Sequence, residues 1–112
     1  MSEASEGIQH IGSQEELDKY LNESGDKLVV LMFYAHWCGP SLFIAPFYEE
    51  LANENTDCVF LRLNTNKASE LADSLGVSQI PTFYFYVKGA KLDQLIGANE
   101  HKLRDHFAKN KS

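Results

Sequence analysis

The chain has 112 residues and a formal net charge of −6, with 44% hydrophobic and 23% charged residues. A chain of this length forms one domain and buries roughly two-thirds of its unfolded surface, so we expect a single domain over 1–112, with a flexible N-terminus at 1–6. The acidic balance, without a basic patch, argues against a nucleic-acid or anionic-membrane partner. No apolar run approaches the ~20 residues that span a bilayer, and residues 1–7 carry no leader-peptide pattern.

The sequence contains two cysteines, Cys38 and Cys58. Two cysteines cannot supply the disulfide framework of a small secreted domain, so we expect a reducing compartment, the cytoplasm. Cys58 begins an apolar stretch and is expected to be a buried strand residue, because a free cysteine behaves as a small hydrophobic side chain. No cysteine or histidine spacing is typical of a zinc site, so we expect no metal.

Along the chain, apolar patterns and turn signals predict alternating strands and helices. Ser13, followed three residues later by Glu16, forms a capping box that starts a helix. The continuous apolar run 28–34 is typical of a central strand covered on both faces. The order, β-α-β-α-β-α-β-β-α, predicts an α/β domain with parallel crossovers first and a hairpin last. The expected elements are strands at 7–11, 28–34, 59–63, 82–87 and 91–96, and helices at 13–24, 38–53, 67–75 and from 99 onward. Gly76 is expected to end the third helix and Asn99 to cap the last one.

The motif Trp37-Cys38-Gly39-Pro40-Ser41 joins the expected central strand to the second helix. It has the form of a disulfide-exchange motif, in which one cysteine attacks a disulfide and a second releases the product, but here the second cysteine is serine. A helix N-terminus offers unpaired N–H groups and the positive end of the helix dipole, and both favour the thiolate that attacks. Pro40 suits a first helical turn, Gly39 leaves the approach to the sulfur open, and Trp37 supplies an apolar wall for an extended peptide. We therefore interpret Cys38 as the nucleophile and Ser41 as the position of the missing resolving cysteine.

The chain resembles the thioredoxin family over nearly its whole length. The resemblance rests on this motif and on Pro46, Ile80-Pro81-Thr82, Gly89 and Gly97-Ala98. The resemblance implies a thioredoxin fold, in which a mixed sheet of four or five strands is flanked by helices, with Cys38 on the exposed rim after the central strand. It also implies a cis peptide bond before Pro81, packed beside Cys38. The substrate groove that it implies consists of Trp37, Ile80, Pro81, Gly97 and Ala98.

Three positions depart from the family pattern. This chain has Ser41 where thioredoxins have a cysteine, and Leu42 where they usually have a lysine. It has Met32 where they have a buried aspartate. In the family the buried acid assists proton transfer at the second cysteine; without that cysteine, a buried acid would bring only a desolvation penalty. The linked departures favour a protein that naturally has one active-site cysteine. The other hypothesis is a trapping variant of an ordinary dithiol thioredoxin, with serine substituted for its resolving cysteine.

We therefore expect Cys38 to exchange disulfides with proteins bound as extended peptides, in cell redox homeostasis. The mixed disulfide would be released by glutathione or by another thiol of the substrate. This would be a protein-disulfide reductase or isomerase activity, weak or glutathione-dependent, in a monomer with no cofactor beyond glutathione as co-substrate.

Two other function classes stay open. A redox-inert peptide-binding adaptor would keep the groove and use Cys38 as a reversible latch or not at all. A glutathione-ligated iron–sulfur cluster, as in monothiol glutaredoxins, is disfavoured because Pro40 constrains the turn. His36, two residues before Cys38, could stabilise the thiolate when protonated, or it could be an exposed loop residue.

Overall fold

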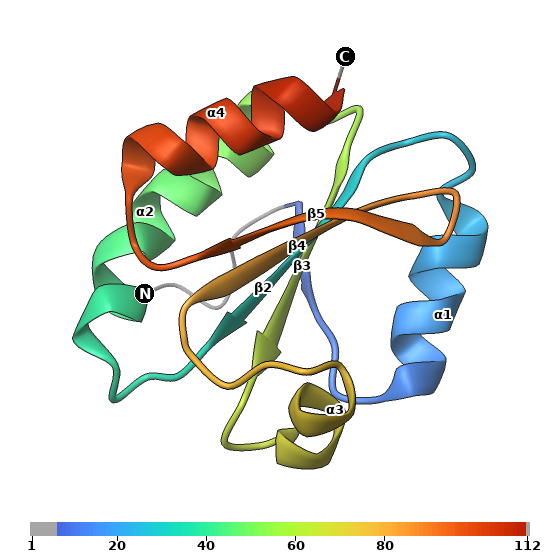
Figure 1. The fold of residues 1–112 in the computed structure, drawn as a ribbon. Helices are drawn as coiled ribbons and strands as arrows, with labels where there is room; N and C mark the ends of the chain where they lie inside the picture. Colours follow the sequence, from blue (N-terminus) through green and yellow to red (C-terminus); the bar gives the residue numbers. More distant parts are fainter. Residues whose placement is uncertain (1–6, 112) are drawn as a thin grey trace.

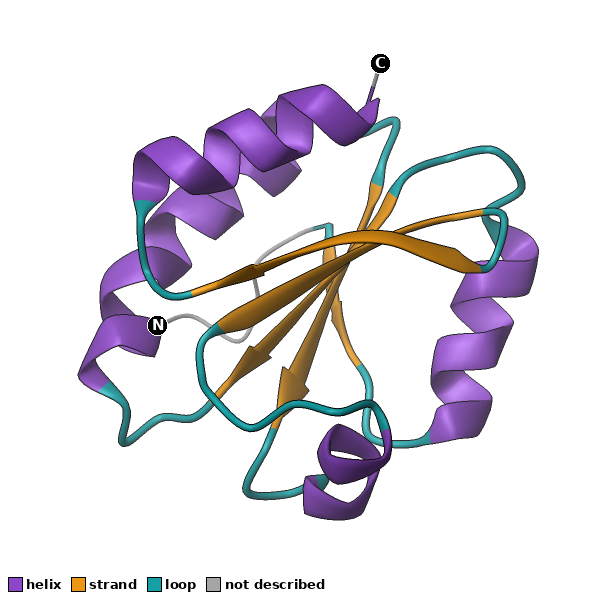
Figure 2. Cartoon of the chain, viewed as in Figure 1, coloured by secondary structure: helices purple, strands orange, loops and turns teal. Residues whose placement is uncertain are grey.

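The computed structural model describes residues 7–111, so the segment expected to be flexible, 1–6, lies outside the described residues. A five-stranded sheet forms the centre, with helices on both of its faces (Figures 1 and 2). The chain order confirms the expected alternation and the final hairpin. The elements are β1 (Ile8–His10), α1 (Gln14–Glu23), β2 (Val29–Tyr34), α2 (Gly39–Glu54), β3 (Val59–Asn64), α3 (Ser69–Ser74), β4 (Thr82–Val87), β5 (Ala90–Ile96) and α4 (Glu100–Lys111).

The strand that follows α1 is the centre of the sheet, as its apolar sequence predicts. The strands lie in the order β1-β3-β2-β4-β5, and all six residues of β2 are buried. β3 runs parallel to both β1 and β2, whereas β4 is antiparallel to β2 and to β5, so the sheet is mixed. Because β1, β3 and β2 run the same way, their carboxyl ends meet at one edge of the sheet, where Tyr34 pairs with Asn64.

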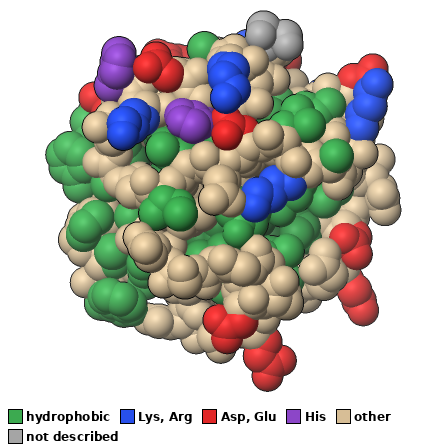
Figure 3. Space-filling model, in the orientation of Figure 1, with side chains coloured by type: hydrophobic (Ala, Val, Ile, Leu, Met, Phe, Trp, Pro, Cys, Tyr) green, Lys and Arg blue, Asp and Glu red, His purple; other side chains and the backbone are tan. Residues whose placement is uncertain are grey.

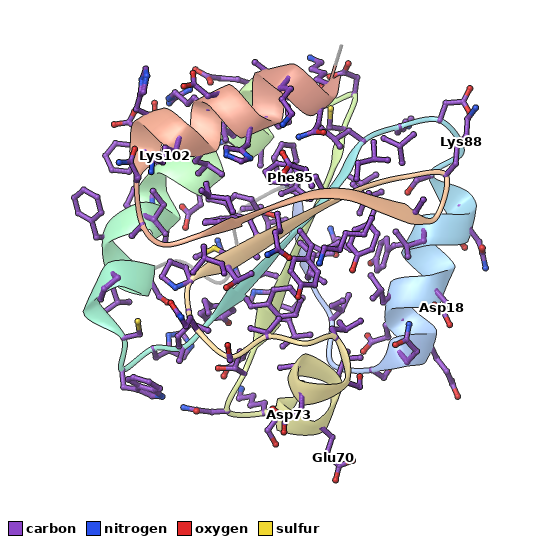
Figure 4. All side chains as sticks on the ribbon, in the orientation of Figure 1. Asp18, Glu70, Asp73, Phe85, Lys88 and Lys102 are labelled. Atoms are coloured by element: carbon purple, nitrogen blue, oxygen red, sulfur yellow. The ribbon has the colours of Figure 1, made fainter. Side chains whose placement is uncertain are left out.

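Two hydrophobic clusters fill the spaces on either side of the sheet. α1 and α3 cover one face, and α2 and α4 cover the other (Figure 1). Successive side chains of a strand point to opposite faces, so Met32 of β2 packs towards α2 while Phe33 packs on the other side. Phe85 of β4 points towards α4, where its ring stacks on His106 at 6.1 Å (Figure 4). Burial of such side chains contributes about 1.5–3 kcal/mol each.

The helix starts follow the capping signals in the sequence. The hydroxyl of Ser13 accepts a hydrogen bond from the Glu16 N–H at 3.2 Å. The Glu16 carboxylate in turn accepts from the N–H of Gly12 at 2.8 Å, one residue before the cap. At the last helix, the Asn99 side chain accepts from the Lys102 N–H at 2.9 Å, which confirms Asn99 as its cap.

The third helix is shorter than the expected 67–75. It begins at Ser69, because the N–H groups of Lys67 and Ala68 both donate to the Asn64 carbonyl in a turn, at 3.1 and 2.9 Å. It ends at Ser74, just before Gly76, whose φ of +82° is readily adopted only by glycine. The expected stop signal is therefore correct, while the expected start is two residues early.

Candidate active site

Cys38 lies between the end of the central strand and the start of α2. Its N–H donates to the Ala35 carbonyl at 3.2 Å, which closes the turn, and its own carbonyl accepts the first helical hydrogen bond, from Leu42, at 3.1 Å. Cys38 is thus the N-cap residue of a 16-residue helix, with Pro40 in the first turn. This position confirms that the motif opens the second helix. It places the thiol at the end of α2 where unpaired N–H groups and the helix dipole favour a negative charge.

The expected exposure of Cys38 is wrong. The residue lies at the rim but only 8% of its surface is accessible. Its sulfur is 3.8 Å from the carbonyl oxygen of Ile80, to which the thiol donates. Space is open beside the neighbouring residue Gly39, where an added Cβ would meet nothing within 4 Å. A substrate disulfide therefore has a restricted approach to the Cys38 sulfur.

Two further loops meet the cysteine from distant parts of the sequence. The Ile80–Pro81 peptide bond is cis, as the resemblance implies. The N–H of Gly97 donates to the Pro81 carbonyl at 2.9 Å, so these two loops lie side by side. Ala98, next to Gly97, is half-buried and packs against the core on the α2 side of the sheet. The structure thus links Cys38, Ile80, Pro81 and Gly97 through successive contacts.

An apolar surface surrounds this point. Trp37 is 69% exposed, and Phe43 and Leu42, on the first turns of α2, are 59% and 45% exposed. Figure 3 shows hydrophobic side chains gathered along the edge of the molecule where Figure 1 places the start of α2. A small hollow of about 190 Å³ lies between Trp37 and Ile80. This surface offers an apolar platform for a peptide beside the thiol.

Ser41 occupies the interior side of the same helical turn. It is 2% exposed, and its hydroxyl has no hydrogen-bond partner among the residues that the structure describes. Side chains three positions apart on a helix are neighbours, with Cβ atoms ~5–6 Å apart. Ser41 therefore lies where a resolving sulfur could reach Cys38, but a hydroxyl cannot form that bond.

Arg62 is a buried residue that sequence reasoning missed. Its side chain on β3 is fully buried, and its Nη2 lies 3.4 Å from the Glu49 carboxylate. Its Nε and Nη1 have no hydrogen-bond partner within residues 7–111. The paired position on β2 is Met32, an apolar residue. A charged residue within the otherwise apolar run 59–63 was the signal that could have identified it, because buried arginines are rare unless paired.

The second cysteine is separated from the first. Cys58 is half-buried and immediately precedes β3, so the expectation of a buried strand residue is wrong. It lies at the N-terminal end of β3, whereas Cys38 follows the C-terminal end of the parallel strand β2. Because six residues of strand span about 20 Å, the two cysteines lie at opposite ends of these strands. Both thiols are free. Burial raises the pKa of the Cys58 thiol, and the negative charge of Asp57 raises it further.

The histidines differ from one another. His36 is exposed on the loop before Cys38, with its ring edge-on to Tyr34 at 5.4 Å. His10 and His101 are exposed. His106 is instead half-buried and bonded to Asp93, because the α4 face that carries it packs on β5. Within 7–111 no group of three or more His, Cys, Asp or Glu side chains could hold a metal ion, and no described helix is long and apolar enough to cross a membrane.

Comparison with known proteins agrees with this geometry. The family model described as Thioredoxin matches residues 9–109. Thioredoxin-3 of Dictyostelium discoideum is 43% identical over 101 residues, which cover 90% of this chain and 94% of the relative. The X-ray structure of Fasciola hepatica thioredoxin superposes with a TM-score of 0.89 at 36% identity, over 92% of this chain and 99% of that one. A chain from the complex of ferredoxin:thioredoxin reductase with thioredoxin f2 gives 0.88 at 33% identity, over 95% and 96%. The sheet and its helices are therefore a thioredoxin fold.

Proposed function

Because this chain belongs to the thioredoxin family, we propose that it exchanges disulfides through Cys38 alone and depends on an outside thiol for release. Membership of the family makes it a thiol–disulfide oxidoreductase of the thioredoxin type. One observation carries the finer proposal: Cys38 caps the N-terminus of α2, while the position that should resolve it holds the buried hydroxyl of Ser41.

The cycle balances with two external thiols. The Cys38 thiolate attacks one sulfur of the substrate disulfide, and the other sulfur leaves as a thiolate and takes up a proton. A glutathione thiolate then attacks the Cys38 sulfur, which frees the second substrate thiol. A second glutathione attacks the glutathione sulfur of the adduct, which regenerates the Cys38 thiolate and gives oxidised glutathione. The substrate disulfide is reduced, and two glutathione molecules are oxidised.

The surroundings of Cys38 support a protein substrate. The exposed faces of Trp37 and Phe43 and the hollow between Trp37 and Ile80 fit a peptide with apolar residues near its disulfide. We propose that the peptide lies extended beside Pro81 and Gly97, which adjoin the sulfur through their loops. The similar thioredoxin f2 is seen in complex with a protein partner, ferredoxin:thioredoxin reductase. We also propose a cytoplasmic monomer.

The second candidate is a trapping variant of a dithiol thioredoxin, because fold and surface fit it equally. Met32 and Arg62 support the first candidate. Met32 is apolar, and Arg62 opposite it has two nitrogens without a hydrogen-bond partner within residues 7–111, which fits a site that no longer handles protons for a second thiol. If the chain is a trapping variant, Ser41→Cys alone restores full reductase activity. If it naturally has one active-site cysteine, Ser41→Cys needs Met32→Asp as well.

The experiment compares two electron sources for reduction of a peptide disulfide. We expect turnover with glutathione, glutathione reductase and NADPH, and negligible turnover with thioredoxin reductase and NADPH, because no disulfide can form between positions 38 and 41. The Cys38→Ala variant should be inactive in both assays, while Cys58→Ala should match the parent chain. Efficient turnover with thioredoxin reductase as the sole electron source would refute the one-cysteine cycle.

A further inference from the structure

A second hollow lies beside the loop that leads to Cys38. Its volume is about 380 Å³, and it opens where the carboxyl ends of β1, β3 and β2 meet, at His10, Asn64 and Tyr34. In open α/β sheets this edge is where ligands usually bind. The hollow is lined by His10, Ile11, Gly12, Tyr34, His36, Asn64, Lys67 and Ala68.

The lining has the opposite charge to the protein as a whole. The chain carries a net charge of −6, yet none of the eight lining residues is an aspartate or glutamate. Lys67 supplies a positive charge, and its ammonium has no ion-pair partner within residues 7–111. One carboxylate adjoins the lining, that of Glu16, which accepts hydrogen bonds from the Gly12 N–H at 2.8 Å and the Ser13 hydroxyl at 3.3 Å.

Hydrogen-bond donors accompany the charge. The rings of His36 and His10 both contact Tyr34 edge-on, at 5.4 and 6.3 Å, so Tyr34 lies between the two imidazoles. The exposed His36 offers an N–H in either protonation state. The side-chain oxygen of Asn64 accepts from the Asn66 N–H at 2.9 Å, which leaves the Asn64 NH₂ group as a donor.

The buried guanidinium of Arg62 adds positive potential to the hollow from behind Tyr34. The guanidinium of Arg62 lies 5.7 Å from the centre of the Tyr34 ring. Its single ion pair, with Glu49, is 3.4 Å long, and two of its nitrogens have no partner within residues 7–111. Charges act over longer distances where water is excluded, so Arg62 favours an anion in the hollow even without touching it.

We propose that this hollow binds a carboxylate of the disulfide that reacts with Cys38. His36 lines the hollow and stands two residues before Cys38, so their Cα atoms are at most about 7 Å apart. This site depends on the proposed exchange at Cys38, and it would make that exchange selective for disulfides that carry a carboxylate. Two sources carry the required group: glutathione, with two carboxylates, and a protein disulfide with an acidic side chain nearby. A carboxylate held by Lys67, His36 and Asn64 would bring the attached sulfur to the thiol.

The first experiment measures the rate at which Cys38 forms mixed disulfides, by mass spectrometry of the whole protein. The reagents are oxidised glutathione, the uncharged bis(2-hydroxyethyl) disulfide, and a peptide disulfide with aspartate or asparagine beside its cysteine. Lys67→Glu should slow the reaction with oxidised glutathione about fivefold and leave the uncharged reagent unaffected. Lys27→Glu is the matched control, because it changes the net charge equally but precedes β2 at the opposite edge of the sheet.

Each outcome either distinguishes glutathione from a protein disulfide as the carboxylate source or refutes the carboxylate site. Slowing with oxidised glutathione assigns the hollow to glutathione, and slowing only with the aspartate peptide assigns it to a protein substrate. Equal effects of Lys67→Glu on charged and uncharged reagents overturn the proposal. If no disulfide reacts with Cys38 in the parent chain, the proposed exchange fails instead.

A second measurement tests the hollow without any reaction. S-methylglutathione and an S-methylated aspartate peptide carry the carboxylates but cannot exchange disulfides. In NMR titrations at least one of them should shift the ring signals of His10 and His36 in a saturable way, in the parent chain and in Lys27→Glu. The shifts should disappear in Lys67→Glu. If neither ligand shifts these rings, the carboxylate site is refuted, whatever Cys38 does.

Discussion

The two cysteines of this chain lie at opposite edges of the same sheet, and exposure does not decide which one suits attack. Cys38 is only 8% exposed, yet it caps α2, where unpaired N–H groups favour a thiolate. Cys58 is more exposed but precedes a strand, beside the carboxylate of Asp57, whose oxygen lies 4.0 Å from the sulfur. Burial raises the pKa of Cys58 most, and Asp57 raises it further.

We expect the surroundings of each thiol, rather than its accessible area, to decide its reactivity. Partial burial and the neighbouring Asp57 both raise the pKa of the Cys58 thiol, and a protonated thiol is a poor nucleophile. A nearly buried thiol at a helix N-terminus needs only one open side, and the next residue, Gly39, has no side chain and open space around it. Four sets of variants test this contrast.

The largest effect on the exchange rate should come from removing each thiol in turn. Cys38→Ala should abolish the mixed disulfide with oxidised glutathione, a loss of at least about 100-fold in rate, because Cys58 lacks a site that favours the thiolate. Cys58→Ala should leave that rate unchanged. Mass spectrometry of the whole protein measures both variants. Comparable adduct formation in Cys38→Ala would show that the two environments are equivalent.

The next effect comes from restoring a second sulfur beside the first. Ser41→Cys should give an internal disulfide, because residues three apart on a helix lie within the distance that a disulfide requires. Turnover with thioredoxin reductase should rise by about 100-fold, since a neighbouring thiol acts at high effective concentration. Ser41→Ala is the matched control and should bring no gain. A coupled NADPH assay measures the rates and mass spectrometry detects the internal disulfide; absence of that disulfide in Ser41→Cys would mean that position 41 does not face Cys38.

A third substitution tests whether thiol reactivity is set locally or by overall stability. The Asp93 carboxylate on β5 accepts from the Asn110 amide and contacts His106 Nδ1, both at 2.8 Å. Burial raises the pKa of Asp93, but these hydrogen bonds and one from the Gln94 N–H lower it more, to about 2. A carboxyl whose pKa is lower in the folded state stabilises the protein above its unfolded pKa, and that stability is lost as the pH falls from about 4 towards 2.

Asp93→Asn should therefore lower the free energy of unfolding by about 1–2 kcal/mol at pH 7, and the difference should shrink below pH 3. Urea titrations at the two pH values measure it. Asp105→Asn removes only an exposed carboxylate and serves as the control, with a much smaller effect expected. Both variants should leave the Cys38 exchange rate unchanged. A slower rate in Asp93→Asn alone would tie reactivity to stability rather than to the helix terminus.

The smallest effect concerns the less reactive thiol. Asp57→Asn removes the anion that raises the pKa of Cys58, so the thiolate fraction at pH 8 should increase. Alkylation of Cys58 by iodoacetamide should become about two- to threefold faster, while alkylation of Cys38 stays the same. Peptide mapping after timed alkylation separates the two sites. An unchanged Cys58 rate would leave burial as the sole cause of its raised pKa.

Local signals in the sequence predicted the elements well where a short-range mechanism sets them. The capping box at Ser13, the cap at Asn99 and the apolar run of β2 need only neighbouring residues, and all three are confirmed. The start of α3 was misplaced because the Asn64 carbonyl takes both N–H groups of the preceding turn, which no nearby residue signals. The cis bond before Pro81 followed from family resemblance and not from local chemistry.

The candidate site was only partly predictable, because its surroundings depend on distant packing. The low exposure of Cys38 arises from the Ile80 loop, 42 residues away in sequence. The hollow near Lys67 exists because three parallel strands end together, and their register cannot be seen in the sequence. Arg62 was overlooked because its strand was judged by its apolar neighbours.

The most direct test isolates the intermediate and asks what releases it. The parent chain would be joined through Cys38 to a peptide with one cysteine, and the mixed disulfide purified. We predict that this adduct persists for hours in buffer and with thioredoxin reductase and NADPH, and that it separates when glutathione is added. Release of the peptide in the absence of an added thiol would contradict the claim that the second half of the exchange comes from another molecule.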